Sequence, residues 1–197
     1  MSDCAPDAVS IRQSILTKYR QAAVSPEGAF PYPVGEQSAL ALGYSAQLTG
    51  AVPARIRARF VGVGNPFSLG PIPPGVAVLD LGCGAGFDTF FAALVVGPSG
   101  RAVGCDLSPE MLAVANAGRE ALRFPNLALL EADIEDLPFA TGSFDIALSN
   151  GVLNLVPDKP RALREIFRVL GPGGRLQACD ISLVGETPPP DKSPWSD

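Results

Sequence analysis

Residues 76–88, which read Val-Ala-Val-Leu-Asp-Leu-Gly-Cys-Gly-Ala-Gly-Phe-Asp, constrain the fold more than any other part of the chain. An apolar strand ends in an acid, Asp80, and is followed directly by Gly82, Gly84 and Gly86. Glycine reaches backbone conformations that other residues avoid, and without a Cβ atom it lets a ligand lie against the main chain. The helix expected next directs its free N–H groups toward the same point. This order predicts a ligand pocket at the carboxyl edge of a parallel sheet.

The spacing of the glycines argues against two kinds of phosphate site. A dinucleotide fingerprint has another glycine three residues after the second one, and Phe87 stands there. A P-loop has Gly-Lys followed by serine or threonine, and no lysine lies nearby. The remaining pattern, Asp-x-Gly-x-Gly-x-Gly, suits a ligand with a cationic amino group. We therefore expect S-adenosylmethionine, with an ordinary tight turn as the alternative.

Composition narrows the class of protein. A chain of 197 residues is long enough for one domain with a substantial core. The net charge of −5 argues against nucleic acid or an anionic membrane as the main partner, because phosphate would be repelled. No basic stretch followed by an apolar one opens the sequence, and no apolar run reaches about 20 residues. The expected location is the cytoplasm.

The sequence contains no histidine, which removes the commonest general base and the usual zinc ligand. Cys4, Cys83, Cys105 and Cys179 lie far apart, so we expect small buried side chains rather than a metal site or disulfides. Methyl transfer from a sulfonium fits this inventory, because the leaving group is good and catalysis depends on alignment and exclusion of water.

From residue 75 onward, apolar segments alternate with helical ones. Strands are expected at 76–81, 101–106, 127–132, 144–149 and about 175–183, and helices at about 86–96, 109–124 and 158–170. Strands that are apolar throughout and separated by helices predict an α/β fold with a doubly wound, mostly parallel sheet. The expected core is 71–184, followed by a proline-rich tail at 185–197.

Residues 1–70 precede the sheet and are expected to form a helical lid over its carboxyl edge. Helices are predicted at 7–23, 36–43 and 53–61. Phe30, Tyr32 and Tyr44 are candidates to face the ligand, with gap filling in the core as the alternative.

Polar residues stand at the ends of the predicted strands. Asp106 is placed to accept both hydroxyls of a ribose. Asp133, followed by Ile134, can accept a hydrogen bond from an adenine amino group, with a solvated loop acid as the alternative. Asn150 would lie where a methyl donor meets its acceptor, so it is the catalytic candidate. Met111 is expected either on the adenine face or in the core.

Several segments resemble the class I S-adenosylmethionine-dependent methyltransferases, namely 80–86, 105–106, 132–134 and 171–174. More narrowly, residues from about 28 to 184 resemble the arsenite methyltransferases, in segments 30–35, 62–66, 84–88, 108–111 and 149–159. The resemblance implies a Rossmann-like fold, S-adenosylmethionine as cofactor and a small-molecule acceptor. The expected cofactor-binding residues are Asp80, Gly82, Cys83, Gly84, Gly86, Asp106, Leu107, Met111, Asp133, Ile134 and Asn150.

The chain departs from the arsenite enzymes, which hold trivalent arsenic on cysteine thiolates. Val63 and Gly151 occupy two of those cysteine positions, and a third lies in a C-terminal region that this chain lacks. Neither side chain can bind a thiophilic centre. Class I sheets usually have two further strands, so we expect a C-terminally shortened sheet whose open fifth strand pairs with a second copy or with a missing segment.

The leading hypothesis is a methyltransferase for a small molecule. Because no general base is evident, an acceptor that is already nucleophilic fits best: a thiol, a soft metalloid or an enolate. Two alternatives are a methyltransferase-like binding module without turnover and a nicotinamide oxidoreductase, against which Phe87 argues.

Overall fold

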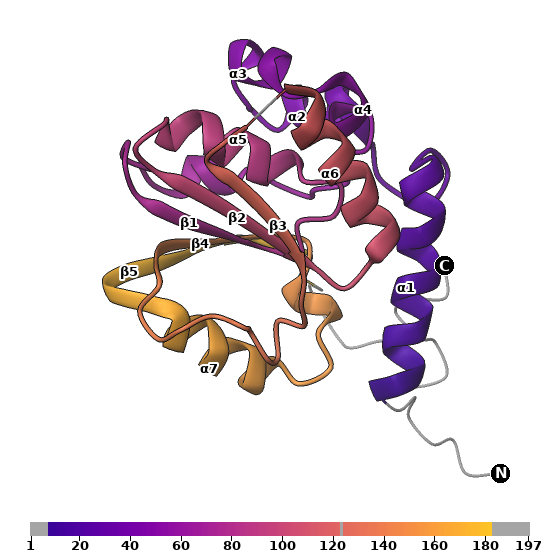
Figure 1. The fold of residues 1–197 in the computed structure, drawn as a ribbon. Helices are drawn as coiled ribbons and strands as arrows, with labels where there is room; N and C mark the ends of the chain where they lie inside the picture. Colours follow the sequence, from indigo (N-terminus) through magenta and orange to yellow (C-terminus); the bar gives the residue numbers. More distant parts are fainter. Residues whose placement is uncertain (1–7, 123, 183–197) are drawn as a thin grey trace, which may run out of the picture.

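A computed structural model describes residues 8–122 and 124–182, and its centre is one sheet of five parallel strands (Figure 1). The strands are β1 (Ala77–Leu81), β2 (Arg101–Asp106), β3 (Leu127–Glu131), β4 (Phe144–Asn150) and β5 (Leu170–Cys179). Their order across the sheet is β3-β2-β1-β4-β5, and every neighbouring pair is parallel. The predicted doubly wound α/β fold is confirmed.

Helices cover both faces of the sheet. On one face lie α5 (Phe87–Val96) and α6 (Pro109–Leu122), and on the other lies α7 (Lys159–Val169) (Figure 1). The N-terminal segment contributes α1 (Ala8–Val24), α2 (Gly35–Ala41), α3 (Ala46–Ala51) and α4 (Ala54–Arg57), and two short 3-10 turns are η1 (Pro66–Leu69) and η2 (Leu153–Leu155). The sequence did not predict α3. Within the described ranges, no helix combines the length and apolarity needed to cross a membrane.

Side chains along the strands alternate between two apolar clusters. Val78 packs with Phe90 in the cluster on the α5 and α6 side. Leu79 and Leu81 pack with Ile166 in the cluster on the α7 side. Because successive residues of a strand point to opposite faces, a strand buried on both faces must be apolar throughout. This explains the unbroken apolar runs of the sequence.

The start of β5 differs from the prediction. It begins at Leu170, opposite Phe144, and the register shifts before Arg175 pairs with Ile146. A Cβ atom on Gly174 would lie 2.9 Å from the carbonyl oxygen of Gly171, so a glycine is needed there. Residues 171–174, which the sequence placed before the strand, are therefore an irregularity within it. The predicted tail at 185–197 and Cys4 lie outside the described residues.

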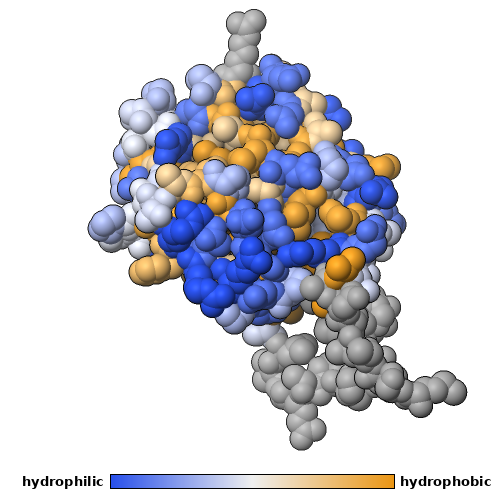
Figure 2. Space-filling view, turned by 60° about the horizontal axis from the view of Figure 1, so that its bottom comes forward, coloured by the Kyte–Doolittle hydropathy of each residue, from blue (hydrophilic) through white to orange (hydrophobic). Residues whose placement is uncertain are grey.

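The open edge of the sheet lies beside α7. Within the described residues β5 pairs with β4 alone, and α7 exposes Leu163 and Phe167. On the side that α7 covers, a broad hydrophilic area lies next to apolar residues (Figure 2). Association of two copies through this edge stays a prediction.

The strand order places the ligand site. From β1 the chain proceeds to β2 and β3 on one side, and then crosses to β4 and β5 on the other. The connections leave β1 and β4 in opposite directions, which opens a crevice at the carboxyl ends of these strands. Open α/β sheets bind ligands at such a switch point.

Candidate active site

A cavity with about 1030 Å³ of empty space, partly open to solvent, lies at this switch point. The predicted residues that line it are Asp80, Gly82, Cys83, Gly84, Asp106, Leu107, Asp133, Ile134 and Asn150. The N-terminal segment contributes Arg12, Ile15, Leu16, Tyr19 and residues 59–62. The structure therefore brings together side chains from both the predicted core and the segment before it.

Two predicted residues lie elsewhere. Met111 is fully buried in the core, so the expectation that it packs on an adenine is replaced by its alternative. Gly86 immediately precedes α5 and has φ of 90°, and a Cβ atom there would lie 3.2 Å from Ala115 and 3.3 Å from Phe90. Gly86 therefore lets α5 approach α6 and does not line the cavity.

The glycine loop, residues 82–86, lines the cavity through residues 82–85 and also packs against Val152. Gly82 has φ of 63°, and a Cβ atom there would lie 2.6 Å from a methyl group of Val152. The Gly84 N–H donates to the Asp106 carboxylate at 2.7 Å. Backbone conformation and close contact both require glycine at position 82.

We expect Gly82→Ala to lower the free energy of unfolding by about 2–4 kcal/mol, because left-handed backbone and overpacking costs add. Urea denaturation measures this loss. Gly28→Ala is the matched control, since Gly28 has φ of 77° and nothing within 4 Å of an added Cβ. The control should lose only the backbone part, about 1–2 kcal/mol. Equal losses in both variants would contradict the importance of the Val152 contact.

Asp106 anchors the loop and the start of α6 with its two oxygens. Besides the Gly84 N–H, it accepts a hydrogen bond from the Ser108 N–H at 2.8 Å. Burial raises its pKa, and the backbone donors oppose this rise. A carboxylate has about four acceptor sites, so acceptor capacity remains for a ligand hydroxyl beside these backbone donors.

Asp80 and Asp88 form a pair of buried carboxylates beside the glycine loop. Asp80 accepts a hydrogen bond from the Thr89 hydroxyl at 2.6 Å. Burial raises the pKa of Asp80 well above its usual range, and the neighbouring Asp88 adds to the rise. Burial also raises the pKa of Asp88, to about 6. Neither carboxylate has an ion-pair partner in the described part of the chain. Buried carboxylates without a cation fit a ligand that supplies one.

Asn150 lines the cavity, but its amide holds the chain before the sheet in place. Its Oδ1 accepts from the N–H groups of Val63 at 2.9 Å and Gly64 at 3.1 Å. Its Nδ2 donates to Asp88 at 2.9 Å and to the Gly64 carbonyl at 2.9 Å. The Tyr44 hydroxyl also donates to Asp88, at 2.6 Å. Asn150 is thus engaged as a positioning residue rather than free to contact a methyl group.

Tyr44 fills the core, which corrects the prediction that it faces the ligand. Its ring is 4% exposed and meets Phe60, Phe67, Phe87 and Phe91 edge-on. The alternative interpretation, gap filling, therefore applies to Tyr44. Phe30 and Tyr32 instead line a second cavity.

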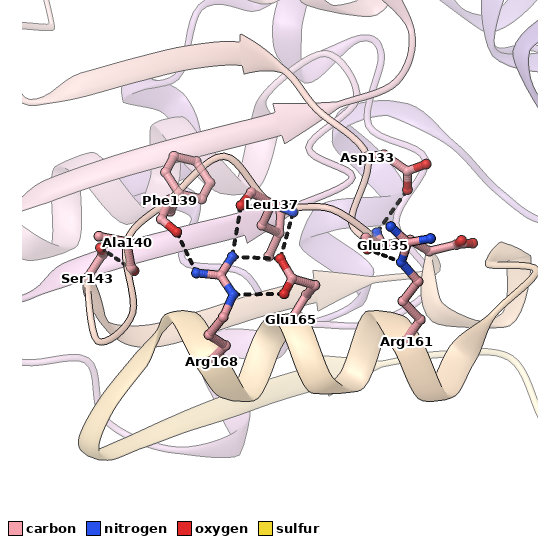
Figure 3. A network of polar contacts seen from close by, with 9 residues as sticks. All are labelled: Asp133, Glu135, Leu137, Phe139, Ala140, Ser143, Arg161, Glu165 and Arg168. Atoms are coloured by element: carbon pink, nitrogen blue, oxygen red, sulfur yellow. Dashed lines mark hydrogen bonds and ion pairs between the residues drawn. The ribbon is translucent and has the colours of Figure 1, made fainter.

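A network on α7 holds the loop that follows β3 (Figure 3). Arg168 forms two hydrogen bonds with Glu165 and donates to the carbonyls of Leu137 and Phe139. Arg161 donates to the Glu135 carbonyl at 2.7 Å. This loop carries Asp133, Ile134 and Glu135 to the cavity, so α7 positions one wall of the site from the opposite face of the sheet.

The helix α1 lines the cavity. It lies beside α6 (Figure 1). Its Arg12 pairs with Asp133 and with Glu135, each at 2.8 Å. Its Arg20 pairs with Glu110 of α6 at 2.6 Å. Asp133, expected to meet an adenine amino group, is thus also an anchor for α1.

Comparison with known proteins decides the family. A model of the methyltransferase domain family matches residues 72–194, which is more than half of the chain. The chain belongs to the class I S-adenosylmethionine-dependent methyltransferases. In this family S-adenosylmethionine is the methyl donor, and the buried acids described above fit its cationic amino group.

Individual relatives share the same core. An arsenite methyltransferase from Halobacterium salinarum is 42% identical over 131 residues, 66% of this chain and 33% of the relative. A demethylmenaquinone methyltransferase from Lactococcus lactis is 42% identical over 108 residues, 55% of this chain and 43% of the relative. The crystal structure of an arsenic(III) S-adenosylmethionine methyltransferase from Chlamydomonas reinhardtii matches with a TM-score of 0.61 and 36% identity, covering 76% of this chain and 50% of that one. The chain therefore spans less than half the length of these two curated relatives.

The positions that correspond to arsenic-binding cysteines by resemblance do meet in this methyltransferase. A Cβ atom on Gly151 would lie 3.3 Å from a methyl group of Val63.

Cys179 lies outside these positions but packs against the residue next to Val63. A Cβ atom on Gly64 would lie 2.8 Å from the Cys179 sulfur. Burial raises the pKa of the Cys179 thiol. In the described ranges, no three acidic or cysteine side chains gather to hold a metal ion.

Sequence reasoning missed several contributors to the site, among them Arg12, Tyr19, Asp88 and residues 59–62. Asp88 carried a usable signal, because it and Thr89 are the only polar residues of α5. Arg12, Tyr19 and residues 59–62 are distant in sequence from the glycine loop, and no local sequence pattern predicts that they line the site.

Proposed function

We propose that this chain transfers a methyl group from S-adenosylmethionine to a small-molecule acceptor. One observation carries the proposal: Asp80 and Asp88 are buried next to the glycine loop without a cation in the described chain. Asp106, one strand away, keeps acceptor capacity for ligand hydroxyls. A ligand with a cationic amino group and a ribose satisfies both features.

The methyl donor supplies an electrophilic methyl group and a good leaving group. The residues of the chain bind, orient and exclude water. Gly82 and Gly84 admit the ligand to the main chain, and α1 and residues 59–62 line the cavity. Positioning of this kind accounts for several kcal/mol of barrier reduction, about 7–11 in favourable model reactions.

The acceptor is proposed to be a small molecule other than thiolate-bound arsenite. Relatives named for arsenite and for demethylmenaquinone support a small acceptor. Val63 and Gly151 offer no thiol at the positions where the arsenite enzymes bind arsenic. The absence of histidine favours an acceptor that needs no general base.

Calorimetric titration with S-adenosylhomocysteine tests the proposed donor site, and transfer of a labelled methyl group to a panel of acceptors tests the reaction. We expect binding and transfer to at least one thiol, phenol or enolate. No binding of S-adenosylhomocysteine would overturn the proposal. Binding without transfer to any acceptor would reduce the chain to a binding module and contradict the proposed turnover.

Binding of S-adenosylhomocysteine is expected to release protons and to tighten as pH rises through about 6. The pKa of Asp88 is raised to about 6 by burial, and the cationic amino group favours its ionised form. Calorimetry in two buffers with different ionisation enthalpies, between about pH 5 and pH 8, counts the protons. Asp88→Asn should reduce the release.

The raised pKa of Asp88 also affects the stability of the unliganded protein, which falls as pH rises, whereas ligand binding tightens. The folded pKa of Asp88 lies above the unfolded value of about 3.9, so its contribution to stability is lost as pH rises toward about 6. Urea denaturation of the wild type and of Asp88→Asn at several pH values measures this contribution. Stability that rises over that range in the wild type relative to the variant would contradict a raised pKa.

A further inference from the structure

A second cavity with about 740 Å³ of empty space, partly open to solvent, has aromatic walls. The ring centroids of Tyr19 and Phe30 are 5.8 Å apart, and those of Phe30 and Tyr32 are 5.3 Å apart. These rings come from α1 and from the loop that follows it. Surfaces of this kind favour a planar, largely apolar molecule, because aromatic rings pack edge-to-face or offset against such a plane.

The two cavities adjoin at shared residues. Ile15, Tyr19 and Leu155 line both of them. A molecule in the second cavity is therefore next to a donor held in the first. The Tyr19 hydroxyl, at this junction, forms no hydrogen bond with the described part of the chain and stays protonated, because burial raises its pKa.

Lys18 brings an uncompensated positive charge to the second cavity. Its side chain is half-buried, and its Nζ lies 5.2 Å from the centroid of the Phe30 ring. No acidic side chain of the described residues pairs with it, although Arg12 and Arg20 on the same helix both have carboxylate partners. In a chain with net charge −5, this charge points to an anionic group on the ligand.

None of the other titratable groups near this cavity that the structure describes offers a positive charge to an anionic ligand, so Lys18 is the candidate. Burial raises the pKa of Tyr32 to about 12, so like Tyr19 it donates rather than carries charge. Asp180 acts on both tyrosines, and its oxygens accept hydrogen bonds from the N–H groups of Asn154 and Ile181. Its charge opposes an anion, and its backbone donors offset part of that effect.

We propose that the second cavity is the acceptor subsite and takes a planar phenol, bound as its phenolate with Lys18 offsetting the negative charge. The inference rests on the proposed methyl transfer, whose acceptor it specifies. A phenolate acceptor also fits a chain without histidine, since a phenolate needs no general base. The phenolic proton leaves to solvent before the reaction.

The transfer balances without a further reactant. The phenolate oxygen attacks the methyl carbon and forms a C–O bond, while the bond between methyl carbon and sulfur breaks and its electron pair stays on sulfur. The negative charge of the phenolate and the positive charge of the sulfonium cancel. The products are a neutral aryl methyl ether and S-adenosylhomocysteine.

Titration of 4-nitrophenol, whose phenolate absorbs visible light, tests the inference in the presence of saturating S-adenosylhomocysteine. We expect the bound probe to ionise at least one pH unit below the free probe, a tenfold shift in its acid dissociation. Lys18→Met should abolish the shift, and Lys18→Arg should retain it. Arg20→Met is the matched control, because it removes a positive charge from the same helix outside the cavity lining and should keep the shift.

Calorimetry with S-adenosylhomocysteine on the same samples separates the two proposals. If the wild type binds S-adenosylhomocysteine but not 4-nitrophenol, or if Lys18→Met leaves the ionisation shift intact, the acceptor inference is overturned. If the wild type does not bind S-adenosylhomocysteine, the proposed function itself fails. Equal binding of S-adenosylhomocysteine by all variants shows that a lost shift comes from the acceptor subsite and not from unfolding.

Discussion

Asp106→Ala is expected to weaken binding of S-adenosylhomocysteine by at least about 100-fold. The substitution removes a carboxylate that fixes the Gly84 N–H and the Ser108 N–H, and that would accept the ribose hydroxyls. Hydrogen bonds to a charged group contribute about 1.5–3 kcal/mol each, so losing two ligand contacts accounts for this factor. Calorimetric titration at a pH near 7.5 gives the dissociation constants.

Two further variants sharpen this result. Asp106→Asn keeps one acceptor oxygen and should bind with intermediate affinity. Asp145→Ala is the matched control, because Asp145 also accepts a backbone hydrogen bond, from Ala77 at 2.8 Å, but lies outside the cavity lining. Wild-type affinity in Asp106→Ala, or an equal loss in Asp145→Ala, would remove Asp106 from the donor site.

Asn150→Leu is expected to lower the free energy of unfolding by about 3–5 kcal/mol. The leucine leaves the N–H groups of Val63 and Gly64 without their acceptor and removes a donor from buried Asp88. Each unsatisfied buried group costs about 1–3 kcal/mol, and the members of such a network reinforce one another. Urea denaturation followed by circular dichroism measures the loss.

Asn116→Leu provides the comparison for this prediction. The Asn116 amide donates to the Leu112 carbonyl within α6 at 3.0 Å, away from any long-range network. Its replacement should cost less than about 1 kcal/mol. A small loss in Asn150→Leu, similar to that of Asn116→Leu, would show that the segment at 62–64 is held by other contacts.

Local pattern was sufficient for much of the fold and for the centre of the site. The apolar runs predicted the strands β1 and β4, because a strand buried on both faces is apolar throughout. The glycines after Asp80 predicted the turn that follows β1, because glycine adopts positive φ readily. The polar strand ends at Asp106 and Asp133 followed from the parallel sheet alone, since its carboxyl ends meet at one edge. Their contacts with a ligand stay a prediction.

Element boundaries were less predictable where tertiary contacts decide. The start of β5 at Leu170 depends on pairing with Phe144. The helix α3 has only six residues, too few for a helix to be stable by its own sequence. Met111 could not be assigned to the ligand or to the core from spacing, because both lie on the inner side of α6. Packing placed it in the core.

The amino-acid sequence by itself determined the strand–glycine–helix unit and the acids at its rim, because these depend on neighbours a few residues apart. Only the tertiary structure decided which distant groups complete the site. Asn150 accepts a hydrogen bond from a residue 86 positions earlier in the chain, Gly64. Lys18 lies over the Phe30 ring, whereas Arg12 and Arg20 on the same helix pair with carboxylates. The physical reason is that hydrogen bonds and charges are satisfied through space, and the partner is whichever group packing brings within reach.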